Sequence, residues 1–304
     1  MSATIVLENV SRWYGNVVAV NGMSFTASPG ITGLLGPNGA GKSTVLHMLS
    51  GFLKPSAGEV TVLGEPAWRN PELYRRLGLV PEREAVYGSL SGYEFVRLNA
   101  RLQGLPDPGG AAREAIRLVD LEDASDRATG GYSKGMKQRI KVAAALVHDP
   151  EVLLLDEPFN GADPRQRLQM TELFRRLAAE GRTLIFSSHI LDEVERLADR
   201  VLVVVGGRLA ASGDFREIRR LMTDRPHTFT LRTSDDRRLA AALVAHGSVL
   251  GVELGDGRVT VRTSQLGAFA RAIPAIAVSS GVTVRELRPT DESLEVVFSY
   301  LVNR

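Results

Sequence analysis

The chain has 304 residues, of which 44% are hydrophobic and 24% are charged. This length leaves room for two domains, and the composition excludes a disordered, collagenous or membrane-embedded chain. The absence of cysteine excludes disulfide scaffolds, iron–sulfur clusters and thiolate zinc sites, and the five histidines are scattered, so any metal is expected to have oxygen ligands.

The charges of the chain are nearly balanced. Lysine and arginine number 37 against 35 aspartate and glutamate residues, and the resulting net charge of +2 predicts no nucleic-acid partner. The arginine pairs are expected to be solvated helix faces rather than nucleic-acid patches; they are Arg75-Arg76, Arg219-Arg220 and Arg237-Arg238.

Neither an export signal nor a membrane span is expected. Glu8 and Arg12 lie where a signal peptide would need an uninterrupted apolar run. The longest apolar stretches, 152–155 and 201–205, are strand-sized and far short of the roughly 20 residues that cross a bilayer. If the protein works at a membrane, we expect a partner to supply the membrane part.

The chain begins with a β-rich segment that leads into a glycine-rich loop. Residues 4–10 and 17–27 have the β-branched and aromatic bias of strands, and the Gly-Asn pair between them predicts a turn. An apolar strand is then predicted over 31–35 and a helix over 42–49, with the glycine-rich loop between the two.

This loop matches the pattern G-x-x-x-x-G-K-[ST], between a strand and a helix as the pattern requires. Its glycines let successive backbone N–H groups turn inward on phosphates, and the dipole of the following helix favours an anion. Lys42 is expected to reach the β- and γ-phosphates, and Ser43 to ligate Mg²⁺. The predicted nucleotide contacts are Gly36, Asn38, Gly39, Ala40, Gly41, Lys42, Ser43 and Thr44.

A helical insert is predicted from about 83 to 148. Residues 91–94, Ser-Gly-Tyr-Glu, match a capping box, and leucine and alanine recur at helical spacing on both sides of 104–106. Ser133 is placed to cap a further helix that runs to about Val147.

Apolar strands return at 152–155, 183–187 and 201–205, and alternate with helical patterns near 164–179 and 190–198. Such alternation predicts a largely parallel sheet.

The first of these strands ends in two adjacent acids, Asp156 and Glu157. Strand burial does not explain them, whereas parallel sheets bind ligands at the carboxyl ends of their strands. We expect Asp156 to hold Mg²⁺ and Glu157 to polarise an attacking water as a general base.

The alternating pattern breaks near residue 225. Residues 227–304 are predicted to form a β-α-β-β-α-β unit followed by a helix from about Asp291. The expected domains are therefore 1–222 and 227–304, and every residue with a predicted chemical role precedes residue 190.

The order of phosphate loop, helical insert, Ser-x-Gly-x-x-Gln segment at 133–138 and acid-pair strand resembles the ATP-binding subunit of an ABC transporter over residues 4 to about 215. The resemblance implies an α/β P-loop ATPase of the ABC type, with a mixed sheet, an antiparallel β edge and a helical subdomain, followed by a small α+β domain. It also implies that Ser133 and the Gly135 N–H of one subunit meet the γ-phosphate of ATP held by another.

Three further residues of the sequence match positions that have a known role in the family. Tyr14 matches the aromatic residue that stacks on adenine, although its position also suits an amphipathic strand-end tyrosine. His189, which follows two serines, matches the histidine that contacts the γ-phosphate and is taken as catalytic. Asp163 lies in the loop through which subunits contact each other, although it is equally the expected cap of the 164–179 helix.

Two positions depart from the usual family pattern. Glu82 follows a predicted strand where many members have glutamine; a carboxylate there can ligate Mg²⁺ and take part in catalysis, but it adds negative charge near Glu157. Lys134 replaces the second-position glycine of the usual Leu-Ser-Gly-Gly-Gln signature. Both departures, together with residues 287–298, resemble ATPases of antibiotic, drug and sodium exporters whose membrane subunits are separate chains.

The implied function is hydrolysis of ATP with Mg²⁺, which powers export of a substrate through integral-membrane permease subunits. The resemblance implies a second ATP-binding subunit, either an identical copy or a homologue, and a peripheral position at the cytoplasmic face of the cell membrane.

Two alternatives are weighed against this interpretation. A soluble ABC-type ATPase that acts on a ribosome or DNA usually has two ATPase units in one chain or a long coiled-coil insert, and the sequence has neither. A simple P-loop kinase would lack the 132–138 segment and would need an arginine-rich lid that the sequence does not show.

Overall fold

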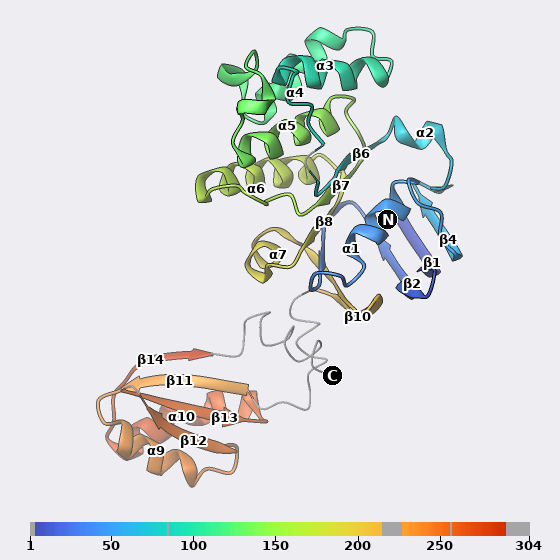
Figure 1. Ribbon diagram of the computed structural model, residues 1–304. Helices are drawn as coiled ribbons and strands as arrows, with labels where there is room; N and C mark the ends of the chain where they lie inside the picture. Colours follow the sequence, from blue (N-terminus) through green and yellow to red (C-terminus); the bar gives the residue numbers. More distant parts are fainter. Residues whose placement is uncertain (1–3, 84, 215–226, 256, 290–304) are drawn as a thin grey trace. The chain divides into compact units, whose positions relative to one another are not determined.

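The computed structural model describes residues 4–83, 85–214, 227–255 and 257–289 (Figure 1). The chain divides between Phe215 and Arg216 into two compact units. The domain limits expected from the sequence, 1–222 and 227–304, stay a prediction, and the helix expected from Asp291 lies outside the described residues.

The first unit begins with the predicted hairpin. Strands β1 (Ile5–Tyr14) and β2 (Val17–Ala27) pair antiparallel around a turn at Gly15, which has a positive φ of 58°. They form a four-stranded antiparallel sheet of order β2-β1-β4-β5 with β4 (Ala57–Val62) and β5 (Glu65–Pro66). The sequence analysis did not predict β4 and β5.

The second sheet of this unit has six strands in the order β10-β9-β3-β8-β7-β6. The neighbouring pairs from β9 to β6 are all parallel, which confirms the predicted parallel sheet, and only the edge strand β10 is antiparallel to its neighbour. The strand bounds are β3 (Gly30–Leu35), β6 (Leu77–Val80), β7 (Val152–Asp156), β8 (Thr183–Ser188), β9 (Arg200–Val205) and β10 (Arg208–Gly213).

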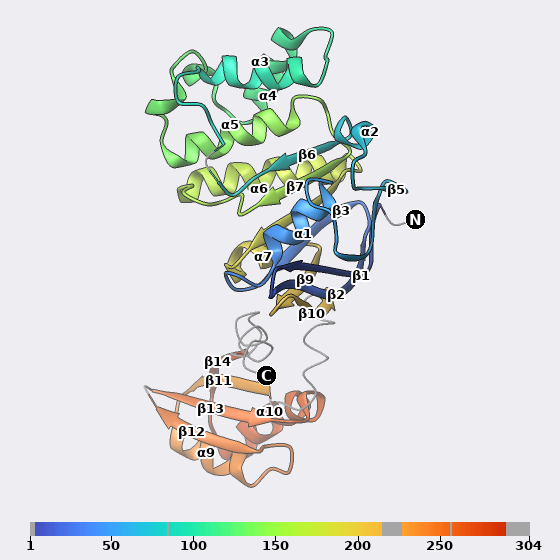
Figure 2. The same cartoon turned by 45° about the vertical axis from the view of Figure 1, so that its right-hand side comes forward.

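Helix α1 (Lys42–Leu49) lies between the two sheets, where it contacts β2, β4 and β7 (Figure 2). Its buried Val45, Leu46 and Leu49 join the apolar side chains of both sheets in one core. Helices α6 (Pro164–Ala179) and α7 (Leu191–Leu197) contact β3 and β8. Since the glycine-rich loop connects β3 to α1, the core of both sheets fixes its position.

The predicted insert is helical, and its main helices are α3 (Gly92–Leu102), α4 (Pro108–Leu118) and α5 (Lys134–Leu146), drawn in green in Figure 1. Each begins at a side-chain cap: Ser91 in a capping box with Glu94, Asp107 on the Gly110 N–H, and Ser133 on the Met136 N–H. Two 3₁₀ turns, η1 (Glu122–Ala124) and η2 (Thr129–Gly131), connect α4 to α5.

The short helix α2 (Pro71–Tyr74) precedes β6. Arg75 and Arg76 were predicted to lie on a solvated helix face, but both follow this helix. Arg75 is exposed, and Arg76, with 41% of its side chain exposed, binds Glu151 through Nε at 2.6 Å and Nη2 at 3.0 Å. The Arg219-Arg220 pair lies outside the described residues.

The second unit has the predicted β-α-β-β-α-β order. Its sheet, of order β12-β13-β11-β14, is antiparallel throughout, the arrangement of a ferredoxin-like fold. The alternating residues Phe229, Leu231, Val259 and Val261 pack with its two helices in a separate core. The elements are β11 (His227–Thr233), α9 (Asp236–Val244), β12 (Gly251–Gly255), β13 (Arg258–Thr263), α10 (Leu266–Ser280) and β14 (Val284–Pro289).

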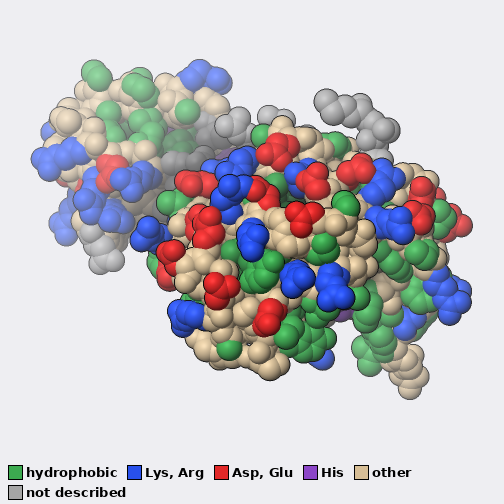
Figure 3. Space-filling view, turned by 90° about the horizontal axis from the view of Figure 1, so that it is seen from above, with side chains coloured by type: hydrophobic (Ala, Val, Ile, Leu, Met, Phe, Trp, Pro, Cys, Tyr) green, Lys and Arg blue, Asp and Glu red, His purple; other side chains and the backbone are tan. Residues whose placement is uncertain are grey.

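On the face shown in Figure 3, lysine and arginine side chains are interspersed with aspartate and glutamate. None of the helices in the described part of the chain has the length and apolar character needed to span a bilayer.

Because the second unit has its own core, a chain that ends at Arg225 is expected to fold and to bind ATP. The measurements are nucleotide binding and sedimentation of the truncated protein beside the full chain. A folded, soluble truncation that binds no ATP would place part of the nucleotide site in the second unit.

Candidate functional site

The glycine-rich loop lies at the carboxyl end of β3 and opens into α1, as predicted. Gly41 is the N-cap of α1 with a φ of 103°, and a Cβ there would collide with the Ala19 carbonyl oxygen. A Cβ at Gly36 would likewise collide with the Val204 carbonyl oxygen. Both positions therefore require glycine, the first for its backbone conformation and both for close packing.

Lys42 is the buried cation of this loop, with 6% of its side chain exposed. Its Nζ donates to the Gly36 carbonyl at 2.8 Å and the Pro37 carbonyl at 3.3 Å. The same Nζ lies 3.6 Å from Glu157 Oε1. A buried charge is tolerated when it is paired and hydrogen-bonded, and both conditions are met here.

The two predicted acids end β7, beside the end of β8. Ser187 Oγ donates to Asp156 Oδ1 at 2.5 Å and accepts from the Glu157 N–H at 2.9 Å. Glu157 has a φ of 48°, an uncommon conformation for a residue with a Cβ. The serine hydroxyl thus fixes the orientation of both acids. The sequence analysis did not assign Ser187 a role, although two serines at a strand end were visible.

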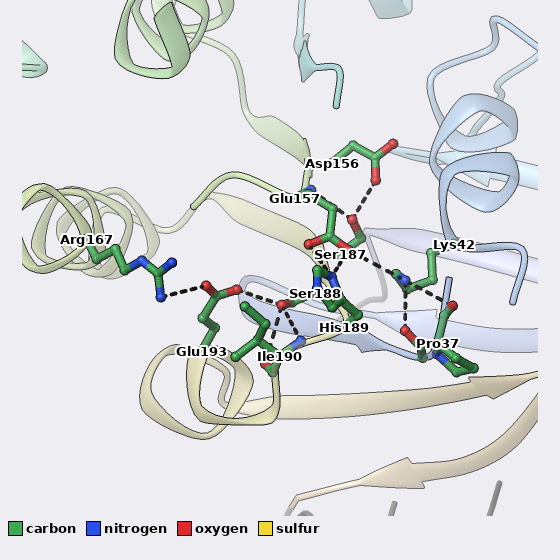
Figure 4. A network of polar contacts seen from close by, with 11 residues as sticks. Pro37, Lys42, Asp156, Glu157, Arg167, Ser187, Ser188, His189, Ile190 and Glu193 are labelled. Atoms are coloured by element: carbon green, nitrogen blue, oxygen red, sulfur yellow. Dashed lines mark hydrogen bonds and ion pairs between the residues drawn. The ribbon is translucent and has the colours of Figure 1, made fainter. Parts of the chain in front are cut away.

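Glu157 lies between two nitrogen groups, as Figure 4 shows. His189 Nδ1 is 3.0 Å from each oxygen of the Glu157 carboxylate, and Lys42 Nζ approaches from the other side. The carboxylate is only 8% exposed, and the histidine is 39% exposed. The hydrogen-bond distance at Nδ1 allows the carboxylate to exchange a proton with the imidazole ring.

A cavity of about 240 Å³ opens beside these groups. The phosphate loop and the start of α1 form one part of its wall, and two acidic residues form another. The lining residues are Asn38, Gly39, Gly41, Lys42, Ser43, Thr44, Glu82 and Glu157. Backbone N–H groups at the start of α1 and the Lys42 ammonium suit an anion. Ser43 and Glu82 supply the oxygen donors that Mg²⁺ prefers, and Asp156 ends the adjacent strand.

Tyr14, Ser133 and Gly135 are not among the residues that line this cavity. Tyr14 ends β1 with 46% of its surface exposed, and the Arg12 guanidinium lies 4.8 Å from the centre of its ring. A Cβ at Gly135 would collide with the Gln166 side chain, and a Cβ at Gly161 with Lys134. The start of α5 therefore lies directly against the loop that precedes α6.

Asp163 caps α6, as predicted from the sequence. Its Oδ1 accepts from the Gln166 N–H at 2.9 Å, and Gln166 Oε1 accepts from the Asp163 N–H at 3.4 Å, which completes a capping box.

Lys141 is a site residue that the sequence analysis missed. It lies on α5 with 5% of its surface exposed, and its Nζ donates to the Pro81 and Arg83 carbonyls at 2.7 and 3.1 Å. The Glu82 carbonyl is 3.4 Å away. One ammonium group therefore holds the backbone of the loop that carries Glu82. The sequence feature that could have indicated this role is a lysine within the apolar run after Gln138.

Comparisons with known proteins agree with this geometry. Residues 20–160 match the family described as ABC transporter. The chain is 32% identical to the bacitracin transport ATP-binding protein BcrA of Bacillus licheniformis, over 99% of this chain and 98% of that protein. It is 40% identical to the Nod factor export ATP-binding protein I of Burkholderia orbicola, over 69% of this chain and 71% of that protein.

A solved structure described as an ATP-binding subunit of an ABC transporter superposes with a TM-score of 0.66 at 30% identity, covering 72% of this chain and 92% of that one. The fold and the phosphate loop define a P-loop ATPase. This chain belongs to the family of ABC transporter ATP-binding subunits. One solved structure of the same fold, a bacterial ABC transporter cassette, is described as dimeric.

Replacing Lys141 by methionine removes the donor from three backbone carbonyls. We expect Lys141→Met to lower the free energy of unfolding by about 3 kcal/mol: the hydrogen bonds to the ammonium contribute roughly 1.5–3 kcal/mol each, and the cost of burying that charge offsets part of their sum. Urea-induced unfolding measures the loss. Lys54→Met, at an exposed lysine, is the control and should stay within about 0.5 kcal/mol of wild type. Equal stability of the two variants would contradict the anchoring role of Lys141.

Proposed function

We propose that this chain hydrolyses ATP to power export through separate permease subunits, at the cytoplasmic face of the membrane. The proposal depends chiefly on one observation, the placement of Glu157 within reach of both Lys42 and His189 beside the phosphate loop. The direction of transport is inferred from two relatives, named for transport of bacitracin and export of Nod factor.

In this proposal the loop N–H groups and Lys42 bind the β- and γ-phosphates of ATP. Glu157 accepts a proton from a water molecule whose oxygen forms a bond to the γ-phosphorus. The bond between that phosphorus and the β–γ bridging oxygen breaks, and ADP and phosphate are released. His189 contacts the γ-phosphate and orients the Glu157 carboxylate through the contact at its Nδ1.

Ser43, Asp156 and Glu82 are the residues that would hold Mg²⁺, which neutralises charge on the phosphate oxygens when bound. Tyr14 would stack on the adenine. Ser133 and Gly135 would act on ATP held by a second subunit, either an identical copy or a homologue. This last role is supported by their position at the start of α5, outside the cavity of their own subunit.

The permease would dock in an apolar groove of about 550 Å³ between the helical insert and the core of the first unit. Phe52, Tyr87 and Leu102 line it with 74%, 64% and 78% of their surface exposed. Pro81 and Lys141 also line the groove, so a docked segment would lie against the loop that carries Glu82. We infer that a cytoplasmic segment of the permease with an apolar face fills this groove.

The alternative of a ribosome- or DNA-acting ATPase is supported less well. The full-length similarity to a bacitracin transport protein favours a transporter, and the mixed charges of the face in Figure 3 do not suit a polyanion.

Glu157→Gln is expected to bind ATP but to lose hydrolysis by roughly 10²–10⁴-fold, because the amide cannot act as a base while the phosphate contacts remain. Steady-state turnover and nucleotide binding by the purified chain measure the two properties. Glu172→Gln, an exposed acid on α6, is the control. A Glu157→Gln variant that keeps more than about a tenth of wild-type turnover would remove the residue from the general-base role.

Leu102→Asp places a charge in the apolar groove. We expect the isolated variant to hydrolyse ATP like wild type, whereas the fraction of the chain recovered with cell membranes falls. Val244→Asp puts the same charge at an exposed apolar position of the second unit, 66% exposed, and serves as the control. Unchanged membrane recovery of Leu102→Asp would place the permease contact elsewhere.

A further inference from the structure

A chain of polar contacts connects the loop before α6 to the end of β8, and Figure 4 shows its part from Arg167 through Glu193 to Ser188. Arg167 Nε donates to the Ala162 carbonyl at 3.1 Å, and its Nη1 lies 3.4 Å from Glu193 Oε1 on α7. Ser188 Oγ donates to the other carboxylate oxygen, Glu193 Oε2, at 2.6 Å. The next residue along the chain is His189.

Glu193 sets the conformation of the turn that carries His189. The Ile190 N–H donates to Ser188 Oγ at 2.9 Å, so the hydroxyl that binds Glu193 also closes the turn around His189. Helix α7 has no other side-chain cap, since its N-cap residue is Ile190. The position of the imidazole relative to Glu157 therefore depends on where the Glu193 carboxylate lies.

The Glu193 carboxylate is buried, and polar partners offset part of the free-energy cost of burying its charge. Only 9% of its side chain is exposed, and burial raises its pKa, while the Ser188 hydrogen bond and Arg167 lower it. The charged groups that face it are Arg167, Glu157 and His189. On the same helix, Asp192 and Arg196 pair with each other at exposed positions. A surface ion pair would contribute little, so the buried placement of this carboxylate invites a functional explanation.

We infer that Glu193 is a positioning residue for hydrolysis, and that with Arg167 it links the loop at 160–163 to the His189–Glu157 pair. The inference rests on the proposed roles of His189 and Glu157. Asp163 lies in the loop expected to contact the second subunit. A change in that contact would therefore move Arg167 and Glu193, and with them the turn that carries His189. A displacement of about 1 Å at a catalytic group can reduce turnover by 10²-fold, so a small shift of this loop is sufficient.

The test compares Glu193→Gln and Arg167→Met in the full-length chain. The glutamine keeps an acceptor for Ser188 but loses the charge that attracts Arg167, and the methionine keeps the apolar stem of the arginine. Controls are Glu195→Gln, at an exposed acid of α7, and Arg176→Met, at an exposed arginine of α6. Turnover, KM for ATP and the thermal unfolding temperature are measured for each variant and for the double variant.

We expect Glu193→Gln to lower kcat by about tenfold while KM for ATP changes less than about twofold. The unfolding temperature should not fall, because the glutamine keeps an acceptor for Ser188 and burial disfavours a charge at this position. Arg167→Met should have a similar effect on kcat. The double variant should be no slower than the slower single variant, because both substitutions break one link.

Three outcomes would overturn the inference: Glu193→Gln turnover equal to that of Glu195→Gln, effects of the two substitutions that multiply, or a loss of kcat that follows a fall in unfolding temperature. Failure of the proposed function is distinguishable from these results. It would appear as a wild-type chain without ATPase activity, or as a Glu157→Gln variant that keeps its turnover.

Discussion

The pairing of Lys42 with Glu157 is the interaction on which the site depends. Each residue is only 6% exposed, and removal of two charges from water costs several kcal/mol per ion unless other groups compensate. The compensation here is specific: two loop carbonyls accept from the lysine, and a histidine faces the carboxylate. Two backbone features bring these charges together: the conformations that the loop glycines allow, and the positive φ of Glu157.

The parallel sheet provides the alignment that this pairing needs. Leu35, at the end of β3, is in register with Ser188, and Asp156, at the end of β7, is in register with Ser187. The phosphate loop, the acid pair and the histidine turn therefore leave three neighbouring strands at the same edge. Side chains that begin at this edge converge without long loops, as is usual for ligand sites of α/β sheets.

Polar contacts also join the surroundings of the cavity to two outlying parts of the first unit. Lys141 joins α5 to the loop that carries Glu82 and lines the apolar groove. On the other side, Arg167 and Glu193 join the loop before α6 to the histidine turn. These links start from the proposed permease groove and from the proposed subunit contact. The first link ends at the backbone of Glu82, which lines the cavity beside Glu157, and the second ends at Ser188, next to His189.

The sequence by itself determined the local structures and the family. The phosphate loop, helix α1, the capping box at Ser91, the Asp163 cap and the parallel strands follow from spacing, cap chemistry and apolar periodicity within short windows. The acid pair could also be placed, since it adjoins a buried strand.

Only the tertiary structure assigned Lys141, Ser187 and Glu193 their contacts. Lys141 binds a carbonyl 60 residues away along the chain, and Ser187 binds a carboxylate 31 residues away. No short window records such a pairing, because the partners meet only after the strands have aligned. A lysine in an apolar helix and a glutamate in a first turn look like ordinary surface residues in sequence, and packing against neighbouring elements is what buries their charges.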